Sequence, residues 1–206
     1  MKLFLSSVGI PQPAAYRELF ANKQTMRIGL IANAWGTYPA GKREPFISQT
    51  TTQLTTLGAT VQPLDLLDYA GKQGKLQKAL QSLDGLWVTG GNSFYLNWAA
   101  HQAGMQYIIG ALCRDGLVYG GESAGAILAT PTLHGVEFVD DANDAPEVLW
   151  DGLGLISFGL VPHWGNPKYA ELLASCRQEM EKHVKAKILT DTQCLVVVDD
   201  HHIVLG

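Results

Sequence analysis

Charged residues are scarce in this sequence of 206 residues. They make up 17% of the chain, whereas hydrophobic residues make up 47%; ordinary soluble domains carry about 25% charged residues. Disorder requires low hydrophobicity and high net charge, so it is excluded as a dominant feature. The 15 basic and 19 acidic residues leave a net charge of -4. This balance argues against the basic surface of a nucleic-acid-binding protein.

Long apolar runs and paired cysteines are also missing. No run approaches the roughly 18 apolar residues of a membrane span, and the first residues lack the apolar run of about 7–15 residues that a secretory signal needs. Cys113, Cys176 and Cys194 form an odd, scattered set. They predict neither a disulfide framework nor a C-x-x-C metal site, and a reducing cytoplasm is the simplest setting. At roughly 150 residues per domain, residues 1–206 are expected to form one domain.

Short apolar runs alternate with helical patterns along the chain. The runs cover residues 2–8, 27–32, 60–66, 86–89, 117–119, 155–161 and 186–189. The helical patterns cover residues 11–21, 45–57, 75–83 and 93–114 (with a break near Gly104), and further patterns follow residues 124 and 166. Strands that are apolar on both faces and separated by helices predict a doubly wound α/β fold, with a mostly parallel sheet and helices on both faces, as in flavodoxin-like proteins. Residues 136–150 read as an acidic surface excursion or hairpin, and residues 188–205 as two strands around a polar turn.

The segment from Gly120 to Ala126 contains the pattern G-x-S-x-G around Ser123. This pattern is typical of a nucleophile elbow, in which a serine sits on a sharp turn between a strand and a helix. Small neighbours are needed because the backbone is crowded there, and the N–H groups that open the helix can stabilise an oxyanion. An apolar strand precedes the pattern and a helical pattern follows it, so Ser123 is the candidate nucleophile. The alternative is a tight turn in which the glycines serve packing alone.

A second glycine turn spans Thr89 to Phe94, again between a strand and a helix. Its free backbone N–H groups could form a phosphate cradle, or Gly91 could supply half of an oxyanion hole. No lysine stands at P-loop spacing, which disfavours a nucleotide phosphate. Asn92 can cap the following helix, and we also take it as a candidate substrate-binding residue.

A third loop places His163 just past a predicted strand. Ligand and catalytic sites of open α/β sheets form at the carboxyl ends of the strands, and Ser123, Gly91 and His163 all fall at such ends. The other five histidines lie in helical patterns, in the irregular stretch or in a turn. His163 is therefore the candidate general base.

A Ser–His pair usually needs a carboxylate that orients the histidine. Asp191 follows the short strand at residues 186–189 and is the favoured candidate. Glu137 and Asp140, which come after the elbow helix, are the alternatives. Glu122 adjoins the nucleophile but should point away from it.

Four motifs, in this order, resemble the peptidase E (aspartyl dipeptidase) family of serine peptidases. They lie at residues 90–94, 121–126, 162–163 and 189–191. The resemblance implies a fold related to class I glutamine amidotransferases, with serine in place of their cysteine nucleophile. It implies Ser123 as nucleophile, His163 as general base, and an oxyanion hole from the backbone N–H groups of Gly91 and Ala124.

The resemblance also bears on the remaining parts of the site. The family's acid near the C-terminal strands matches Asp191 by position, and an assignment between the elbow and the histidine would match Glu137. The family is cytoplasmic and needs no metal or cofactor. Its longer segment after the histidine, which carries basic residues suited to an aspartyl side chain, is reduced here to residues 164–168. Lys168 is the only cation in that segment and the candidate partner for a substrate carboxylate.

The sequence therefore predicts a serine peptidase that acts on short peptides, with Asp-X dipeptides as one candidate class. An esterase or amidase that acts on a non-peptide substrate is the alternative with the same chemistry. A non-catalytic binding protein of the same fold is the alternative from a different class. The oligomeric state is not predicted.

Overall fold

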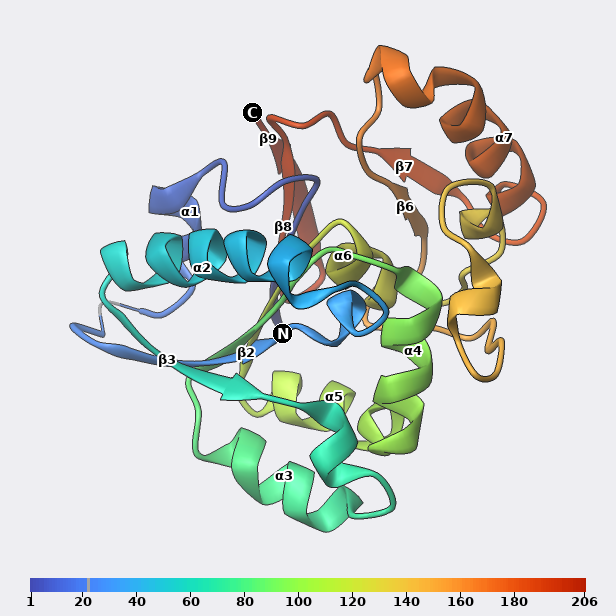
Figure 1. Ribbon diagram of the computed structural model, residues 1–206. Coiled ribbons are helices and arrows are strands. Elements are labelled where there is room, and N and C mark those ends of the chain that lie inside the picture. The colour runs from blue at the N-terminus through green and yellow to red at the C-terminus, as the bar shows by residue number, and fades with distance from the viewer. Residues whose placement is uncertain (22) are drawn as a thin grey trace.

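The computed structural model describes residues 1–21 and 23–206. A seven-stranded sheet runs through it in the order β3-β2-β4-β5-β1-β8-β9 (Figure 1). The strands are β1 (Lys2–Ser6), β2 (Met26–Ile31), β3 (Ala59–Leu64), β4 (Gly85–Val88), β5 (Val118–Glu122), β8 (Cys194–Val198) and β9 (His201–Leu205). The first five strands in the sheet order pair in parallel, whereas β8 and β9 are antiparallel to their neighbours. The predicted mostly parallel sheet is confirmed.

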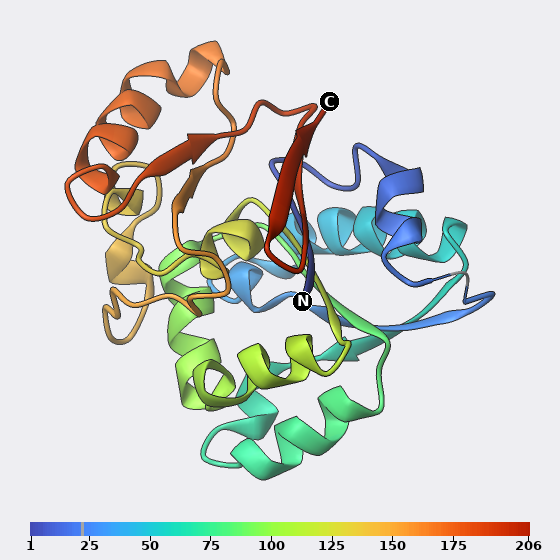
Figure 2. The same ribbon diagram turned by 180° about the vertical axis from the view of Figure 1, so that it is seen from behind.

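Helices cover both faces of this sheet (Figures 1 and 2). On one face lie α1 (Pro13–Glu18) and α2 (Ala40–Thr56); on the other lie α3 (Gln73–Gln81), α4 (Ser93–Gln102), α5 (Met105–Arg114) and α6 (Ala124–Leu128). Neighbouring residues of β1 show how the core is divided between the two faces of the sheet. Phe4 packs in one core cluster with Tyr16, whereas Leu3 and Leu5 pack in another with Ile109. Because successive side chains of a strand point to opposite faces, both faces must be apolar.

The chain leaves the main sheet between α6 and β8. There β6 (Gly159–Val161) and β7 (Ala186–Ile188) pair in parallel as a separate two-stranded sheet, and α7 (Ala170–Met180) connects them. We expected one strand over residues 155–161, and this expectation is wrong for its first half. The backbone N–H groups of Leu155 and Ile156 donate instead to the carbonyl of Ala129, and this segment pairs with none of the described strands.

Residues 136–150 do not form the expected hairpin or a simple surface excursion. They contain two short 3-10 helices, Val136–Phe138 and Ala142–Asp144, and the side chains of Val136 and Ala145 are buried. The amide of Asn97 on α4 donates to the carbonyl oxygens of Leu149 (2.8 Å) and Asp151 (3.1 Å). These contacts hold the segment against the rest of the molecule.

The C-terminal pair of strands is confirmed as β8 and β9, with its turn at Asp199 and Asp200. The first strand begins at Cys194 and not at residue 188, and His201 and His202, expected in the turn, lie in β9. The helix predicted from residue 45 begins earlier, at Ala40, because Pro39 in extended conformation provides its N-terminal boundary. Within residues 1–21 and 23–206, no helix is long and apolar enough to cross a membrane.

Candidate active site

Ser123 occupies the turn between β5 and α6, as the elbow pattern predicts. Its φ of 49° lies in the left-handed region, which is uncommon for a residue other than glycine. The two glycines of the pattern face each other across the turn: a Cβ on Gly121 would lie 2.5 Å from the carbonyl oxygen of Gly125, and one on Gly125 would collide with the carbonyl of Val88. The pattern is therefore a packing requirement that lets the strained serine project from the sheet.

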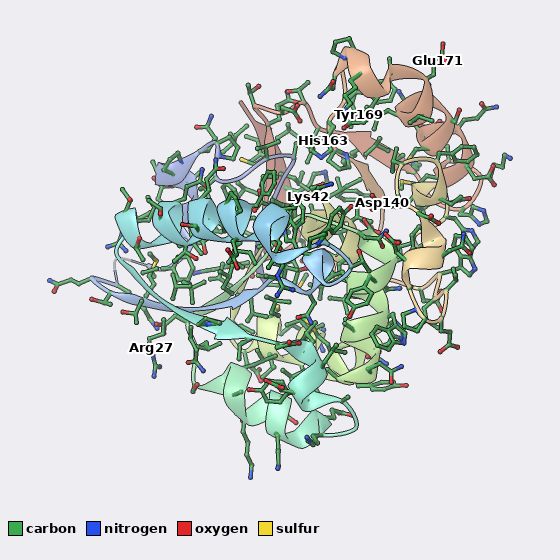
Figure 3. The ribbon with its side chains drawn as sticks, viewed as in Figure 1. Arg27, Lys42, Asp140, His163, Tyr169 and Glu171 are labelled. Atoms are coloured by element: carbon green, nitrogen blue, oxygen red, sulfur yellow. The ribbon has the colours of Figure 1, made fainter. Side chains whose placement is uncertain are left out.

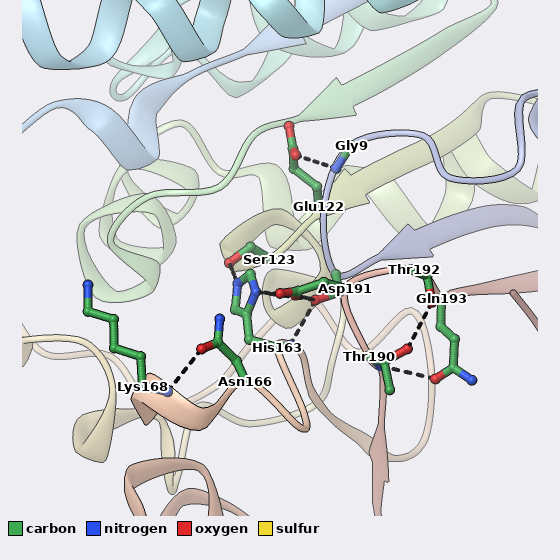
Figure 4. Close-up of polar contacts among 11 residues, drawn as sticks. Gly9, Glu122, Ser123, His163, Asn166, Lys168, Thr190, Asp191, Thr192 and Gln193 are labelled. Atoms are coloured by element: carbon green, nitrogen blue, oxygen red, sulfur yellow. Dashed lines mark hydrogen bonds and ion pairs between the residues drawn. The ribbon is translucent and has the colours of Figure 1, made fainter. Parts of the chain in front are cut away.

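His163 lies two residues beyond β6 and comes from the separate two-stranded sheet. Its φ of 63° is again in the left-handed region. Its Nε2 lies 2.9 Å from the hydroxyl oxygen of Ser123, which is within hydrogen-bond distance (Figure 4). A base that close to a serine hydroxyl can accept its proton.

Asp191 follows β7 and meets the other nitrogen of the same imidazole. Its Oδ1 lies 2.7 Å from Nδ1 of His163 (Figure 4). Burial raises the pKa of Asp191, but hydrogen bonds from Ser7 and His163 outweigh this and hold the pKa below its ordinary value. An ionised carboxylate can only accept, so Nδ1 carries the proton and Nε2 is left free to accept one from Ser123.

Ser7 is a member of this cluster that the sequence analysis missed. Its hydroxyl donates to Oδ1 of Asp191 (2.8 Å) and accepts from the backbone N–H of His163 (2.7 Å). Ser7 lies directly after β1, and sites of open α/β sheets form at the carboxyl ends of strands, so its position marks it as a candidate. The predicted strand over residues 2–8 was too long at this end and placed Ser7 inside the strand, so Ser7 was not recognised.

Of the two backbone N–H groups predicted for the oxyanion hole, that of Ala124 opens α6 and that of Gly91 lies two residues before α4. Ala124 is the first residue of α6, where N–H groups have no partner within the helix. Gly91 has a φ of +130°, and a Cβ there would lie 2.5 Å from the carbonyl carbon of Ala34. The preceding residue, Gly90, approaches the nucleophile, since a Cβ on it would lie 3.2 Å from Cβ of Ser123.

The two predicted substrate-binding side chains lie outside the cavity around Ser123. The buried amide of Asn92 caps α4 through the N–H of Tyr95 and donates to the backbone of Asp141 and the carboxylate of Asp144. Lys168 is exposed, and its Nζ lies 4.9 Å from the ring centroid of Tyr169. Asn92 is thus bonded within the protein, and the close-up in Figure 4 marks no contact between the side chain of Lys168 and Ser123, His163 or Asp191.

The alternative acids do not contact His163. The exposed Glu137 accepts from the backbone N–H of Gly135 at 2.6 Å. Asp140 and His163, both labelled in Figure 3, line the same cavity, but Asp140 accepts from the backbone N–H of Ser93 at 2.9 Å. Burial raises the pKa of Asp140, although Ser93 and His163 lower it.

Glu122 points away from the nucleophile, as expected, and supports the loop that carries Ser7. Its carboxylate accepts from the backbone N–H of Gly9 (2.6 Å), the hydroxyl of Thr50 (3.1 Å) and the indole N–H of Trp87 (3.4 Å). The β1–α1 loop is thereby tied to the residue that precedes Ser123.

A cavity of about 500 Å³ opens in front of Ser123 and His163. One wall comes from the loop after β1, from α2 and from the turn before α2; it includes Val8, Trp35, Tyr38, Phe46, Gln49 and Gln53. The opposite wall includes Ile127, Val139, Val161, Tyr169, Leu173 and Cys176. This size and largely apolar lining suit a small ligand. Among the described residues, no group of three or more His, Cys, Asp or Glu side chains is arranged to hold a metal ion.

A serine, a histidine and an aspartate joined by hydrogen bonds are the arrangement found in Ser-His-Asp hydrolases. Comparison with known families shows which family the chain belongs to. The profile of peptidase family S51 matches residues 16–205. The chain therefore belongs to peptidase family S51.

Individual relatives agree with this assignment. An uncharacterised peptidase of Pasteurella multocida is 25% identical over 100% of this chain and 97% of its own length. Peptidase E of Streptomyces coelicolor is 32% identical over 64% of this chain, and an uncharacterised peptidase of Listeria monocytogenes is 31% identical over 58% of it. The matched regions span 55% and 58%, respectively, of these two relatives' own lengths.

Two solved structures share the fold. A crystal structure of a Listeria monocytogenes protein provisionally named peptidase E superposes with a TM-score of 0.85 and 23% identity, covering 99% of this chain and 97% of the other. The structure of a peptidase from an acI-B1 actinobacterium superposes with a TM-score of 0.76 and 19% identity, covering 100% and 87%. At these identities the likeness shows the fold, not the substrate.

Proposed function

We propose that this protein is a serine peptidase that hydrolyses short peptides through an acyl-enzyme, with Ser123, His163 and Asp191 as its catalytic residues. The observation that carries the proposal is that these three side chains are linked by hydrogen bonds beside the cavity. Oγ of Ser123 lies 2.9 Å from Nε2 of His163, and Nδ1 of His163 lies 2.7 Å from Oδ1 of Asp191. Membership of peptidase family S51 supports peptide bonds as the target.

The first half of the reaction forms the acyl-enzyme. Oγ of Ser123 attacks the peptide carbonyl carbon while Nε2 of His163 takes the hydroxyl proton, and the carbonyl π electrons move onto oxygen. The N–H groups of Gly91 and Ala124 stabilise this oxyanion. When the intermediate collapses, the C–N bond breaks and His163 gives its proton to the leaving amine.

The second half of the reaction uses water. His163 takes a proton from a water molecule that attacks the acyl carbon, and the Ser123 oxygen leaves as the proton returns to it. Asp191 stabilises the imidazolium that forms in each half. Water is the one co-reactant of the proposed hydrolysis: its oxygen joins the acyl carbon, one of its protons replaces the Ser123 proton that left with the amine, and the enzyme returns to its starting state.

Three buried cysteines without disulfide bonds support a reducing compartment, and we propose the cytoplasm. A cavity of about 500 Å³ has room for only a few residues of a peptide. It therefore favours short substrates over folded proteins.

The test compares the wild type with Ser123→Ala on a panel of dipeptides, both Asp-X and neutral X-X, and labels both proteins with a fluorophosphonate probe. We expect peptide cleavage and labelling by the wild type and neither by the variant. Ser123-dependent cleavage of esters alone would transfer the proposal to an esterase or amidase. Absence of both cleavage and labelling in a folded protein would refute the catalytic proposal and leave a binding protein.

A further inference from the structure

The cavity in front of Ser123 is acidic. Two carboxylates, those of Glu122 and Asp140, line it, and none of its described lining residues is a lysine or an arginine. The three donors to Glu122 described above satisfy that carboxylate within the protein. Asp140 accepts one backbone hydrogen bond, from Ser93, and no salt bridge is formed by it within residues 1–21 and 23–206.

The effect of Asp140 extends to its neighbours in the cavity. Burial raises the pKa of Tyr38, and the charges of Asp140 and Asp144 raise it further. Burial likewise raises the pKa of Cys176 to about 12, with added contributions from Glu137 and Asp140. Both groups therefore experience a negative field, in which a second anion is disfavoured.

The wall beside the catalytic residues is apolar. Ile127 lies one helical turn beyond Ser123 on α6, and Val161 lies two residues before His163. Leu173 and Cys176 on α7 complete this surface, and all four side chains are buried. An acidic substrate side chain against this wall would lose its hydration and meet no donor in exchange.

Lys168 does not offset this charge. It is not one of the lining residues, and its ammonium group, 4.9 Å from the ring centroid of the lining residue Tyr169, is fully exposed at the rim. An exposed lysine contributes little to binding a carboxylate because water and salt screen the interaction.

Building on the proposed peptidase function, we propose that this cavity selects peptides with uncharged, apolar residues beside the scissile bond and rejects acidic side chains there. The specificity follows from two features: the apolar wall formed by Ile127, Val161, Leu173 and Cys176, and the carboxylate of Asp140, which pairs with no cation in the described part of the chain. The relevant substrates are thus neutral short peptides, and Asp-X dipeptides are poor substrates.

The test uses pairs of amidated dipeptides, so that the terminal carboxylate does not enter the comparison. Asn-Leu-amide and Asp-Leu-amide differ at the first residue in charge but hardly in shape, and Leu-Asn-amide and Leu-Asp-amide differ in the same way at the second. We expect kcat/KM to be at least tenfold higher for the neutral member of each pair and highest for Leu-Leu-amide. Equal or faster cleavage of the acidic member of either pair would overturn the proposal.

A matched pair of variants tests the origin of the selectivity. Asp140→Asn removes the negative charge from the cavity, whereas Asp141→Asn makes the same change at the exposed neighbouring residue. We expect the Asn-to-Asp ratio of kcat/KM to fall at least threefold in Asp140→Asn and to stay unchanged in Asp141→Asn. The ratio is independent of overall activity, and the wild-type pairs test the selectivity even if Asp140→Asn fails to fold.

The variant Lys168→Ala tests the opposite hypothesis, in which Lys168 recognises an acidic substrate side chain. A selective loss of activity toward Asp-Leu-amide in this variant would show that Lys168 recognises acidic substrates and would overturn the proposal. Ser123-dependent cleavage with acidic preference would refute the selectivity alone. Absence of any Ser123-dependent cleavage would refute the proposed peptidase function, so the two failures are distinguishable.

Discussion

The hydroxyl of Ser7 donates a hydrogen bond of 2.8 Å to Oδ1 of Asp191, the same oxygen that lies 2.7 Å from Nδ1 of His163. The hydroxyl also accepts from the backbone N–H of His163. Ser7 thus links the histidine and the aspartate, which come from different loops, through a third loop that follows β1. It acts as a positioning residue, because its hydrogen bonds go to Asp191 and His163, which orient the base, and not to the nucleophile Ser123.

Replacing Ser7 by valine should slow the reaction, whereas replacing it by threonine should not. Both residues are β-branched and similar in size, but only threonine keeps the hydroxyl. A hydrogen bond to a charged group contributes about 1.5–3 kcal/mol, so kcat/KM of Ser7→Val should fall about 10- to 100-fold. The pKa of Asp191 should also rise, because one of the hydrogen bonds that lowers it is lost.

The readouts for this pair are kcat, KM and the pH dependence of both, with circular dichroism to establish folding. A positioning role predicts a fall mainly in kcat and recovery in Ser7→Thr. Equal losses in both variants would assign Ser7 a purely steric role.

Substitution of the acids should identify the third catalytic residue. Asp191→Asn removes the acceptor that holds the proton on Nδ1 of His163, and we expect kcat to fall by about 10³–10⁴. Glu137→Gln should change kcat by less than about twofold, because Glu137 contacts the backbone of Gly135 and not the histidine. Steady-state kinetics on any cleaved peptide checks both, and the reverse result would make Glu137 the acid.

Gly91 should tolerate no side chain. A Cβ there would lie 2.5 Å from the carbonyl carbon of Ala34, and the φ of +130° is unfavourable for alanine. We expect Gly91→Ala to lose about 1–3 kcal/mol of unfolding free energy or more and most of its activity. Gly71→Ala is the control: its φ is also positive (+66°), but no atom of the described residues lies within 4 Å of the added Cβ.

Urea unfolding of the two glycine variants separates two costs. Both variants place alanine at a positive φ, whereas only Gly91→Ala also brings a Cβ into collision with Ala34. Gly71→Ala should lose about 1 kcal/mol and keep its activity. Similar losses of stability and activity in both variants would argue against a special requirement at Gly91.

Asp84 should contribute stability that depends on pH. Its carboxylate accepts from Nζ of Lys23 (2.6 Å) and from the backbone N–H of Arg27 (2.7 Å). Burial raises its pKa, but these hydrogen bonds and the nearby positive charges lower the pKa below the ordinary value of 3.8. A lowered pKa in the folded state stabilises the protein above the unfolded-state pKa, and this stability is lost as the pH falls through the folded-state pKa.

Thermal unfolding of the wild type and Asp84→Asn between pH 7 and pH 3 checks this expectation. The Tm difference should be largest near neutral pH, equivalent to about 1–2 kcal/mol, and should shrink below about pH 4. Asp115→Asn, at the exposed end of α5, is the charge-matched control. A Tm difference that does not vary with pH would contradict the prediction.

Much of the fold followed from local patterns. The parallel strands were recognised from apolar runs, and the break between α4 and α5 from Gly104, whose φ is +72°. The helical pattern expected after residue 166 is also present: Asn166 caps the short 3-10 helix Pro167–Tyr169, and α7 begins directly after it. These features depend on residues a few positions apart, so a single sequence carries the information.

The assignments of Asn92 and Lys168 to substrate binding stay untested predictions, and the structure offers them other roles. The sequence placed both near the motifs but could not show which side chains face the cavity. Asn92 is directed toward the segment at residues 141–144, about fifty positions away, and no pattern near Asn92 indicates that pairing.

The sequence alone determined the α/β class, the strained turn at Ser123, and the three residue types that the proposed chemistry needs at the ends of strands. These depend on hydrophobic periodicity and on the steric demands of glycine, which act locally. Only the tertiary structure decided that His163 and Asp191 come from a separate small sheet, that Ser7 joins them, and that Glu122 and Asp140 make the cavity acidic. Those relationships are distances and buried charges between segments far apart in the chain, and they exist only once the chain has folded.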